Sequence, residues 1–306
     1  MAAVRRAAVI GTGTMGPGIG AVLARAGVET GLYDVSAEAL ERARGGAELA
    51  AGVLERLDAA QEDGGSLRFE SDLAAALEGA EFVIEAVPEK LELKHQVFRQ
   101  LEAAVAADAI LASNTSGIPI TSIATATEHP ERVVGMHWSN PPHLIPMIEV
   151  IPGEQTSQAA VDAASDLVRR IGYHPVLEQE VPGFVENRIL YAILRECLDL
   201  VDRGIISPEG LDLNVRWGIG YKLAVIGPME LLDMAGLDIY DAVGSYLNRD
   251  LSTSAEVSST IRAKIAEGRL GMKTGGGIYD YTPEQIEELR AKRAGKLVAV
   301  RKALEG

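Results

Sequence analysis

The chain has 306 residues, of which 47% are hydrophobic, and because a single core rarely grows beyond ~250–300 residues we expect two globular domains. The formal net charge of −15 argues against nucleic acid and anionic membrane surfaces as partners, and no apolar run reaches the ~20 residues that span a bilayer. Cys197 is the only cysteine, which fits a reducing, cytoplasmic location without a disulfide or a cysteine metal cluster, and we expect no metal.

The first half of the chain predicts a parallel sheet with helices. Residues 7–10 and 29–33 are short strand-like runs on either side of a helical stretch, residues 17–26, which makes a β-α-β unit. Residues 36–61 predict one long or broken helix, because three glycines interrupt the helical spacing. Further helices are expected at residues 91–106 and 158–171, and further strands at residues 82–86, 109–112, 133–136, 147–151 and 174–177. Such alternation is typical of a mainly parallel, doubly wound sheet of the Rossmann type, covered on both faces.

Helical patterns dominate beyond Pro182-Gly183. The expected helices are residues 185–203, 208–217, 228–234, 239–249 and 255–267. Thr282 is expected to cap a last helix that has Pro283 at its first position. We therefore expect a sheet domain over residues 1–181 and an all-α domain over residues 182–306.

The run Gly11-Thr12-Gly13-Thr14-Met15-Gly16 lies between the first expected strand and helix, the context in which Gly-x-Gly-x-x-Gly binds a dinucleotide. Gly11 permits the tight turn, Gly13 lets the backbone approach the pyrophosphate, and Gly16 allows close helix packing. Asp34 ends the next strand and offers a carboxylate to ribose hydroxyls, while its charge would repel a 2′-phosphate. The two residues after it include no arginine, so NAD is favoured over NADP.

Downstream of this loop the chain carries a base, a carboxylate to orient it and two polar groups for an oxygen. An imidazole such as that of His137 can accept a hydroxyl proton while hydride leaves the same carbon. Glu149 would hold the ring, and Ser116 and Asn187 would donate to the oxygen on which charge gathers. This order of residues favours hydride transfer by an NAD-dependent dehydrogenase.

These motifs resemble the 3-hydroxyacyl-CoA dehydrogenase superfamily over about residues 7–281. The motifs are the Gly11 loop with Asp34, Glu85-Ala86-Val87-Pro88-Glu89, Ser113-Asn114-Thr115-Ser116, the run from His137 to Pro141, Glu149, Pro182-Gly183-Phe184, Asn187-Arg188, Gly227-Pro228 and Lys273-Thr274-Gly275. The resemblance implies that the catalytic residues are Ser116, His137, Glu149 and Asn187. It also implies a homodimer formed through the helical half, and cofactor contacts from Ala86, Glu89, Lys94, Asn140 and Lys273.

The sequence departs from the acyl-CoA members of the superfamily in two places. Those members carry a Lys-rich helical hairpin after the ribose-binding Asp, whereas residues 47–71 here contain Arg56 and Arg68, no Lys and several acidic residues. They also carry a Lys just before the apolar triplet of the catalytic Glu, where this chain has Pro146. A CoA phosphate would meet an unfavourable field, so the expected substrate is a small carboxylate-bearing alcohol or aldehyde not carried on CoA.

The run from His137 to His143 is similar to a pyridine-ring branch of the superfamily, which oxidises 5-formyl-3-hydroxy-2-methylpyridine-4-carboxylate to the dicarboxylate in vitamin B6 degradation. There, His137 would deprotonate a water that attacks the aldehyde. Trp138 would stack on the aromatic ring or pack in the core, His143 would touch substrate or be structural, and Arg188 or Arg195 would meet the carboxylate.

Two alternatives stay open at this point. A short-chain 3-hydroxyacyl-CoA dehydrogenase keeps the enzyme class but changes the substrate. A non-catalytic NAD-binding or structural protein would keep only the fold.

Overall fold

The computed structural model describes residues 4–305 and divides into two compact units, Met1–Asn187 and Arg188–Gly306. The sequence places the division after residue 181, whereas the first turn of the helix that follows lies with the sheet unit. Among the described residues, no helix is long and apolar enough to cross a membrane.

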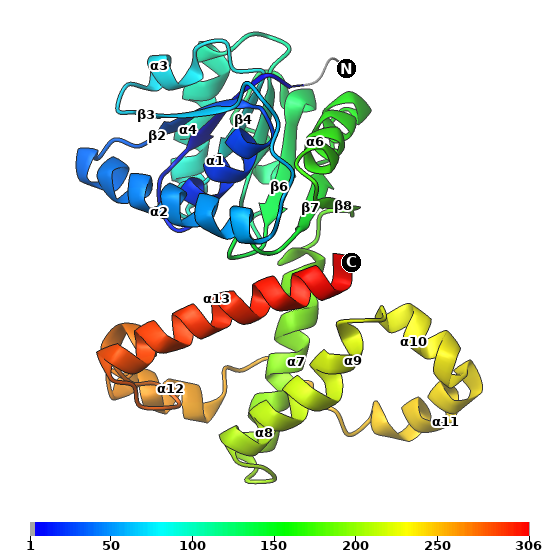
Figure 1. The fold of residues 1–306 in the computed structure, drawn as a ribbon. Helices are drawn as coiled ribbons and strands as arrows, with labels where there is room; N and C mark the ends of the chain where they lie inside the picture. The colour runs from blue at the N-terminus through cyan, green and yellow to red at the C-terminus, as the bar shows by residue number, and fades with distance from the viewer. Residues whose placement is uncertain (1–3, 306) are drawn as a thin grey trace. The chain divides into compact units, whose positions relative to one another are not determined.

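The first unit is built on one eight-stranded sheet with the order β3-β2-β1-β4-β5-β6-β7-β8 (Figure 1). Every neighbouring pair is parallel except β6 and β7, which are antiparallel. The strands are β1 (Arg6–Ile10), β2 (Glu29–Tyr33), β3 (Ser66–Glu70), β4 (Phe82–Glu85), β5 (Ile110–Ser113), β6 (Val133–Trp138), β7 (Met147–Pro152) and β8 (His174–Leu177). The mainly parallel, Rossmann-type sheet expected from the sequence is confirmed.

Helices cover both faces of this sheet, because successive strand residues point to opposite sides and both sides are apolar. On one face, strand residues such as Val9, Ile84 and Met136 pack against α1 (Gly16–Arg25), α2 (Ala37–Arg56) and α6 (Gln158–Arg170). On the other face, residues such as Ala8, Val83 and Leu111 pack against α3 (Leu73–Leu77), α4 (Leu91–Ala104) and α5 (Ile120–Ala124). A 3-10 turn, Pro130–Arg132, leads into β6.

In the region after Asp34, the structure has the long helix of the two alternatives left open for residues 36–61, together with two elements that were not expected. Helix α2 runs unbroken through its three glycines, because one face of it is buried against α1 and tertiary packing outweighs ~1 kcal/mol of lost helix propensity per glycine. Strand β3 and helix α3 were not predicted from the sequence. Strand β3 lies at the sheet edge and its middle residues are only half-buried, so it lacks the apolar run that marks the central strands.

The second unit is helical, as expected, although α7 begins in the first unit. Its elements are α7 (Phe184–Asp202), α8 (Pro208–Asn214), a π-helical turn (Val215–Gly220), α9 (Tyr221–Leu223), α10 (Pro228–Ala235), α11 (Leu237–Leu247), α12 (Ser259–Ala266), a 3-10 turn (Met272–Thr274) and α13 (Pro283–Glu305). The predicted cap of α13 is confirmed, because Gln285 N–H donates to Thr282 Oγ1 at 3.2 Å and Thr282 N–H donates to Gln285 Oε1 at 2.9 Å.

Candidate active site

The glycine loop after β1 packs against the chain that leaves β4. Gly11 has a φ of +107°, and a Cβ there would lie 2.7 Å from the backbone oxygen of Ala86. A Cβ on Gly16 would lie 2.1 Å from the backbone oxygen of Gly11. A Cβ on Gly13, in contrast, would have no protein atom within 4 Å. The loop therefore has no room for a side chain at Gly11 and Gly16, whereas the space beside Gly13 is open among the described residues.

The loop fits a dinucleotide at the point where the strand order reverses, between β1 and β4. Helix α1 begins directly after it, and its N-cap residue, Met15, makes no side-chain capping bond, so the first N–H groups of the helix are available to an anion. The open position at Gly13 leaves room for a pyrophosphate to reach them.

Asp34 is held at the end of β2 by three hydrogen bonds. Its Oδ2 accepts from the N–H and the hydroxyl of Thr12, at 2.9 and 2.7 Å, and its Oδ1 accepts from Ser36 N–H at 3.0 Å. Burial alone would raise the pKa of Asp34, but these bonds outweigh burial and lower it. The carboxylate is therefore charged at neutral pH and faces a pocket of about 470 Å³, whose lining includes Thr14, Asn140 and His143.

His137 and Glu149 form a buried pair. They stand directly opposite each other on the antiparallel strands β6 and β7, so their side chains lie on the same face of the sheet. His137 Nδ1 and Glu149 Oε2 are 2.6 Å apart, and the two side chains are 8% and 2% exposed. Glu149 Oε1 accepts from two backbone N–H groups, those of Val185 at 3.1 Å and Glu186 at 2.7 Å.

These contacts keep the carboxylate of the pair ionised. Burial would raise the pKa of Glu149, but the hydrogen bonds from His137 and from the N–H of Glu186 lower it. Gly183 and Phe184 bring the N–H groups into place, since both have positive φ, 79° and 52°, and turn the chain sharply into α7. A positive φ at a buried phenylalanine is a strained conformation of the kind found at functional sites.

Ser116 and Asn187 are also brought together. Asn187 Nδ2 donates to the backbone oxygen of Ser116 at 3.0 Å, and the N–H of Ser116 donates to Glu89 Oε1 at 3.0 Å. Asn114 joins this loop to β6, because its Oδ1 accepts from the N–H of Trp138 at 2.9 Å. The loop after β5 therefore lies beside the strand that carries His137.

A buried ion-pair network holds the loop after β5 in place through Glu89. Lys94 is 1% exposed, and its Nζ contacts both oxygens of Glu85, at 2.7 and 2.9 Å, and Glu89 Oε2 at 3.2 Å. Glu89 also accepts from the hydroxyl of Thr115, and although burial would raise the pKa of Glu89, that bond and Lys94 lower it. Among the described residues, Lys94 is thus bound to carboxylates rather than exposed to a ligand.

Two of the expected substrate residues, Trp138 and His143, lie in the first unit. Trp138 is 2% exposed and packs edge-on against Tyr173, with ring centroids 5.9 Å apart, so it is a core residue and offers no open face for stacking. Of the two roles left open for Trp138, packing is the one that the structure supports. His143 lies against Gly18 of α1, in the pocket of the glycine loop, and burial lowers its pKa.

The other expected ligand-binding residues belong to the second unit. Arg188, Arg195 and Lys273 belong to the second unit, and all three are exposed. Their contacts with a ligand stay predictions.

Motif reasoning missed two carboxyl groups near the His137–Glu149 pair. Glu186 accepts from the hydroxyl of Ser139, and Glu178, which follows β8, accepts from the N–H of Val185 at 3.1 Å. Both belong to segments that fold back onto the pair, so no local spacing in the sequence indicates them. His137, Glu149 and Glu186 have ligand-type atoms within 4.8 Å of one another, but each is already used in hydrogen bonds, and we assign them no metal.

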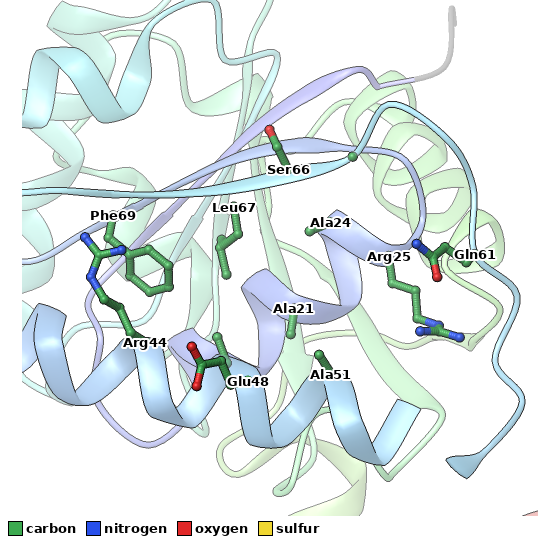
Figure 2. A pocket seen from close by; sticks show the side chains of 12 residues that line it. Ala21, Ala24, Arg25, Arg44, Glu48, Ala51, Gln61, Ser66, Leu67 and Phe69 are labelled. Atoms are coloured by element: carbon green, nitrogen blue, oxygen red, sulfur yellow. The ribbon is translucent and has the colours of Figure 1, made fainter. Parts of the chain in front are cut away.

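A second pocket, of about 420 Å³, lies between α1, α2 and β3 (Figure 2). Its cationic side chains are already engaged. The guanidinium of Arg44 lies 4.5 Å from the centre of the Phe69 ring, and Arg25 donates twice to the backbone oxygen of Ala59, at 2.9 and 2.7 Å. Glu48 adds a negative charge to the lining, so this pocket is poorly suited to a phosphate.

Two family models match consecutive stretches of the chain. Residues 6–181 match the NAD-binding domain of 3-hydroxyacyl-CoA dehydrogenase, and residues 183–281 match its C-terminal domain. The chain belongs to the 3-hydroxyacyl-CoA dehydrogenase family. The resemblance expected from the motifs is confirmed, and with it the class of NAD-dependent dehydrogenase.

Within this family, the chain is 54% identical to the 5-formyl-3-hydroxy-2-methylpyridine 4-carboxylate 5-dehydrogenase of Mesorhizobium japonicum, over 99% of each chain. A crystal structure of an enzyme with this activity, described as an NAD+ dependent dismutase, superposes with a TM-score of 0.97 at 54% identity over 99% of each chain. A probable 3-hydroxybutyryl-CoA dehydrogenase from Deinococcus radiodurans is 36% identical over 89% of this chain and 99% of its own. The (S)-3-hydroxybutyryl-CoA dehydrogenase of Ralstonia eutropha has a TM-score of 0.73 at 30% identity, over 92% of this chain and 100% of its own.

Proposed function

We propose that this dehydrogenase oxidises the aldehyde 5-formyl-3-hydroxy-2-methylpyridine-4-carboxylate to the dicarboxylate with NAD. The observation that carries the proposal is the 54% identity over 99% of both chains to a relative with that activity, against 36% to the relative that is a probable 3-hydroxybutyryl-CoA dehydrogenase. Pyridine carboxylates are small anions, in agreement with the absence of CoA-type lysines in the sequence.

His137 serves as the base in this proposal. Its Nδ1 is bound to Glu149, which leaves Nε2 as the nitrogen that takes a proton from a water attacking the aldehyde carbon. Glu149 orients the ring and stabilises the imidazolium that forms. The exposed side chain of Ser116 and the amide of Asn187, which share one loop contact, donate to the aldehyde oxygen as charge builds on it.

The NAD contacts are assigned to the carboxyl edge of the sheet. The loop residues Gly11, Gly13, Thr14, Met15 and Gly16 would hold the pyrophosphate, and Asp34 would accept from the ribose. Ala86, Glu89 and Asn140 would lie along the nicotinamide half, with Lys94 acting through the carboxylate of Glu89. A bound NAD would supply the hydride acceptor for the aldehyde hydrate, and its reduced form would supply a hydride donor for a second aldehyde.

We assign a different role to each of the two domains. Residues 1–181 bind NAD, whereas residues 182–306 supply the carboxylate contacts of Arg188 or Arg195, the approach of Lys273 and the subunit contact of a homodimer. The many exposed apolar side chains of the second unit support the subunit contact. A cytoplasmic location stays a prediction from cysteine usage.

Acyl-CoA turnover is the second candidate, because several relatives are named for it, but the local structure disfavours it. Arg68 is paired with Glu70 at 3.5 Å and also bonds the backbone oxygen of Ala75, so it is not available to a 3′-phosphate. A catalytically idle role is disfavoured by the assembled His137–Glu149 pair.

The test is to incubate the enzyme with NAD and the pyridine aldehyde, and to measure NADH together with the dicarboxylate and alcohol products. We expect the dicarboxylate to form, with turnover of acetoacetyl-CoA at least about a hundredfold slower. Products must be measured as well as NADH, because dismutation would give equal amounts of acid and alcohol with little net NADH. Robust turnover of acetoacetyl-CoA without any product from the aldehyde would reject the proposal.

A further inference from the structure

Glu178 stands beside Glu149 because β8 pairs in parallel with β7. Glu149 is opposite Val176 in the register, and Glu178 N–H continues the ladder by donating to the backbone oxygen of Val150 at 3.2 Å. Residues two apart in a strand point to the same face, so the side chain of Glu178 lies on the face of Glu149. Both carboxyl groups accept from the same N–H, that of Val185, each at 3.1 Å.

The second oxygen of Glu178 has no donor. Oε2 is buried and without a hydrogen-bond partner among the described residues, although a buried carboxylate oxygen normally has one. The titratable groups that act on it are Glu149 on β7 and His137 on β6, and the carboxyl group of Glu186, at the start of α7, lies within 4.8 Å of that pair. Lys94, Arg132 and Arg170, cationic residues of the same unit, are paired with carboxylates other than Glu178. An added proton would turn the orphan oxygen into a donor and remove one of two adjacent negative charges.

We propose that Glu178 is a positioning residue for the His137–Glu149 pair, a carboxylic acid that keeps its proton in the ligand-free enzyme and donates it in a hydrogen bond to Glu149. Burial, the negative charge of Glu149 and the hydrogen bond to Glu149 raise the pKa of Glu178 to about 7, in agreement with this geometry. Since one carboxylate then remains, Glu149 keeps the charge that faces the imidazole.

The proposal concerns the same site as the proposed function, and its first test needs neither substrate nor NAD. Infrared spectroscopy detects the carbonyl stretch of a neutral carboxylic acid. We expect this band at about pH 5.5 and its loss by about pH 8.5, well above the range in which an ordinary glutamate titrates. The band should be absent from Glu178→Gln and unchanged in Glu154→Gln, which removes one exposed carboxylate elsewhere in the same unit.

The second test separates hydrogen bonding from charge. The amide of Glu178→Gln can still donate to Glu149, so kcat/KM for the aldehyde should stay near the wild-type value at about pH 6. The part of the pH dependence near pH 7 that Glu178 contributes should disappear, whereas the part due to the base His137 should remain. Glu178→Leu also lacks the negative charge but cannot donate, and kcat/KM should fall about tenfold, as for loss of one charge-assisted hydrogen bond. Thermal unfolding of each variant identifies a folding defect.

Three results would overturn the proposal: no titrating acid band in the wild-type protein, a band that persists in Glu178→Gln, or pH profiles of wild type and Glu178→Gln that superimpose. If the aldehyde is not a substrate, the infrared band still decides whether Glu178 holds a proton. Failure of the proposed function and failure of this inference are therefore distinguishable.

Discussion

His137 has one ring nitrogen committed to structure and one left for chemistry. Nδ1 is fixed to Glu149, whose other oxygen is held by two N–H groups at the start of α7. The ring is tilted against Phe184, with centroids 5.7 Å apart, which limits its rotation. The imidazole is thus oriented before any ligand arrives, and little reorganisation is needed when a proton moves.

Replacing His137 with Ala should lower turnover of the aldehyde by at least about a hundredfold, the usual contribution of a general base. His174→Ala is the matched control, because His174 is exposed at the start of β8 and should leave turnover unchanged. Steady-state rates of the folded variants make the comparison. Near-normal turnover in folded His137→Ala would remove the base from the proposed mechanism.

Individual residues of the site could be predicted where they belong to a recognisable sequence motif. Ser116, His137, Glu149 and Asn187 were indicated by residue type and order, and the structure gathers them at the ends of β5, β6 and β7 and the start of α7. Glu178 was not, because its proximity to Glu149 depends on the β7–β8 register. The burial of Trp138 was left open, since an aromatic residue after the catalytic histidine fits a core and a ligand pocket equally well.

At the scale of the structural elements, two glycines in the turn between β1 and α1 should respond differently to substitution by alanine. Gly16→Ala should lower the unfolding midpoint, because its Cβ would lie 2.1 Å from the backbone oxygen of Gly11. Gly13→Ala should unfold like the wild type, because its Cβ meets no protein atom within 4 Å, yet should weaken NAD binding at least about tenfold by filling the space of the pyrophosphate.

Thermal unfolding and calorimetric titration with NAD measure the two effects separately. Gly45→Ala, on an open position of α2, controls for a glycine change remote from the loop and should be neutral or slightly stabilising. Wild-type NAD affinity in Gly13→Ala would show that the cofactor does not approach the loop there.

The central strands and the edge strand β8 were predicted from the sequence, whereas the other edge strand, β3, was not. Central strands such as β1, β4 and β6 are buried on both faces and read as apolar runs. The edge strand β3 has alternating polar residues and gives no such signal. Helix α2 shows the limit of local propensity, because burial against α1 holds it straight through glycines that favour a break.

At the scale of the whole molecule, the carboxyl groups of the site make the free energy of unfolding depend on pH in two opposite ways. The pKa values of Asp34, Glu89 and Glu149 are lowered in the folded protein, so their contribution to stability is lost as pH falls through those values. The pKa of Glu178 is raised from 4.5 to about 7, so its contribution is full below 4.5 and is lost as pH rises toward 7. Stability should therefore be greatest at mildly acidic pH.

Glu178→Gln removes the alkaline branch of this dependence. Its unfolding midpoint should exceed that of the wild type by about 2 °C or more at about pH 8, and come close to it at about pH 4.5, where Glu178 is neutral in the folded protein. Differential scanning calorimetry across this range, with Glu154→Gln as the control for net charge, makes the measurement. A midpoint difference that does not change with pH would argue against a perturbed acid at position 178.

The antiparallel pairing of β6 and β7 has a consequence for how the catalytic pair is held in place. The imidazole and its carboxylate are cross-strand neighbours in one hairpin, so the ladder of backbone bonds maintains their separation whatever chain connects them. Residues 139–146, which make that connection, include Asn140 and His143 in the lining of the glycine-loop pocket. One hairpin therefore supplies both the His137–Glu149 pair and part of the wall of that pocket.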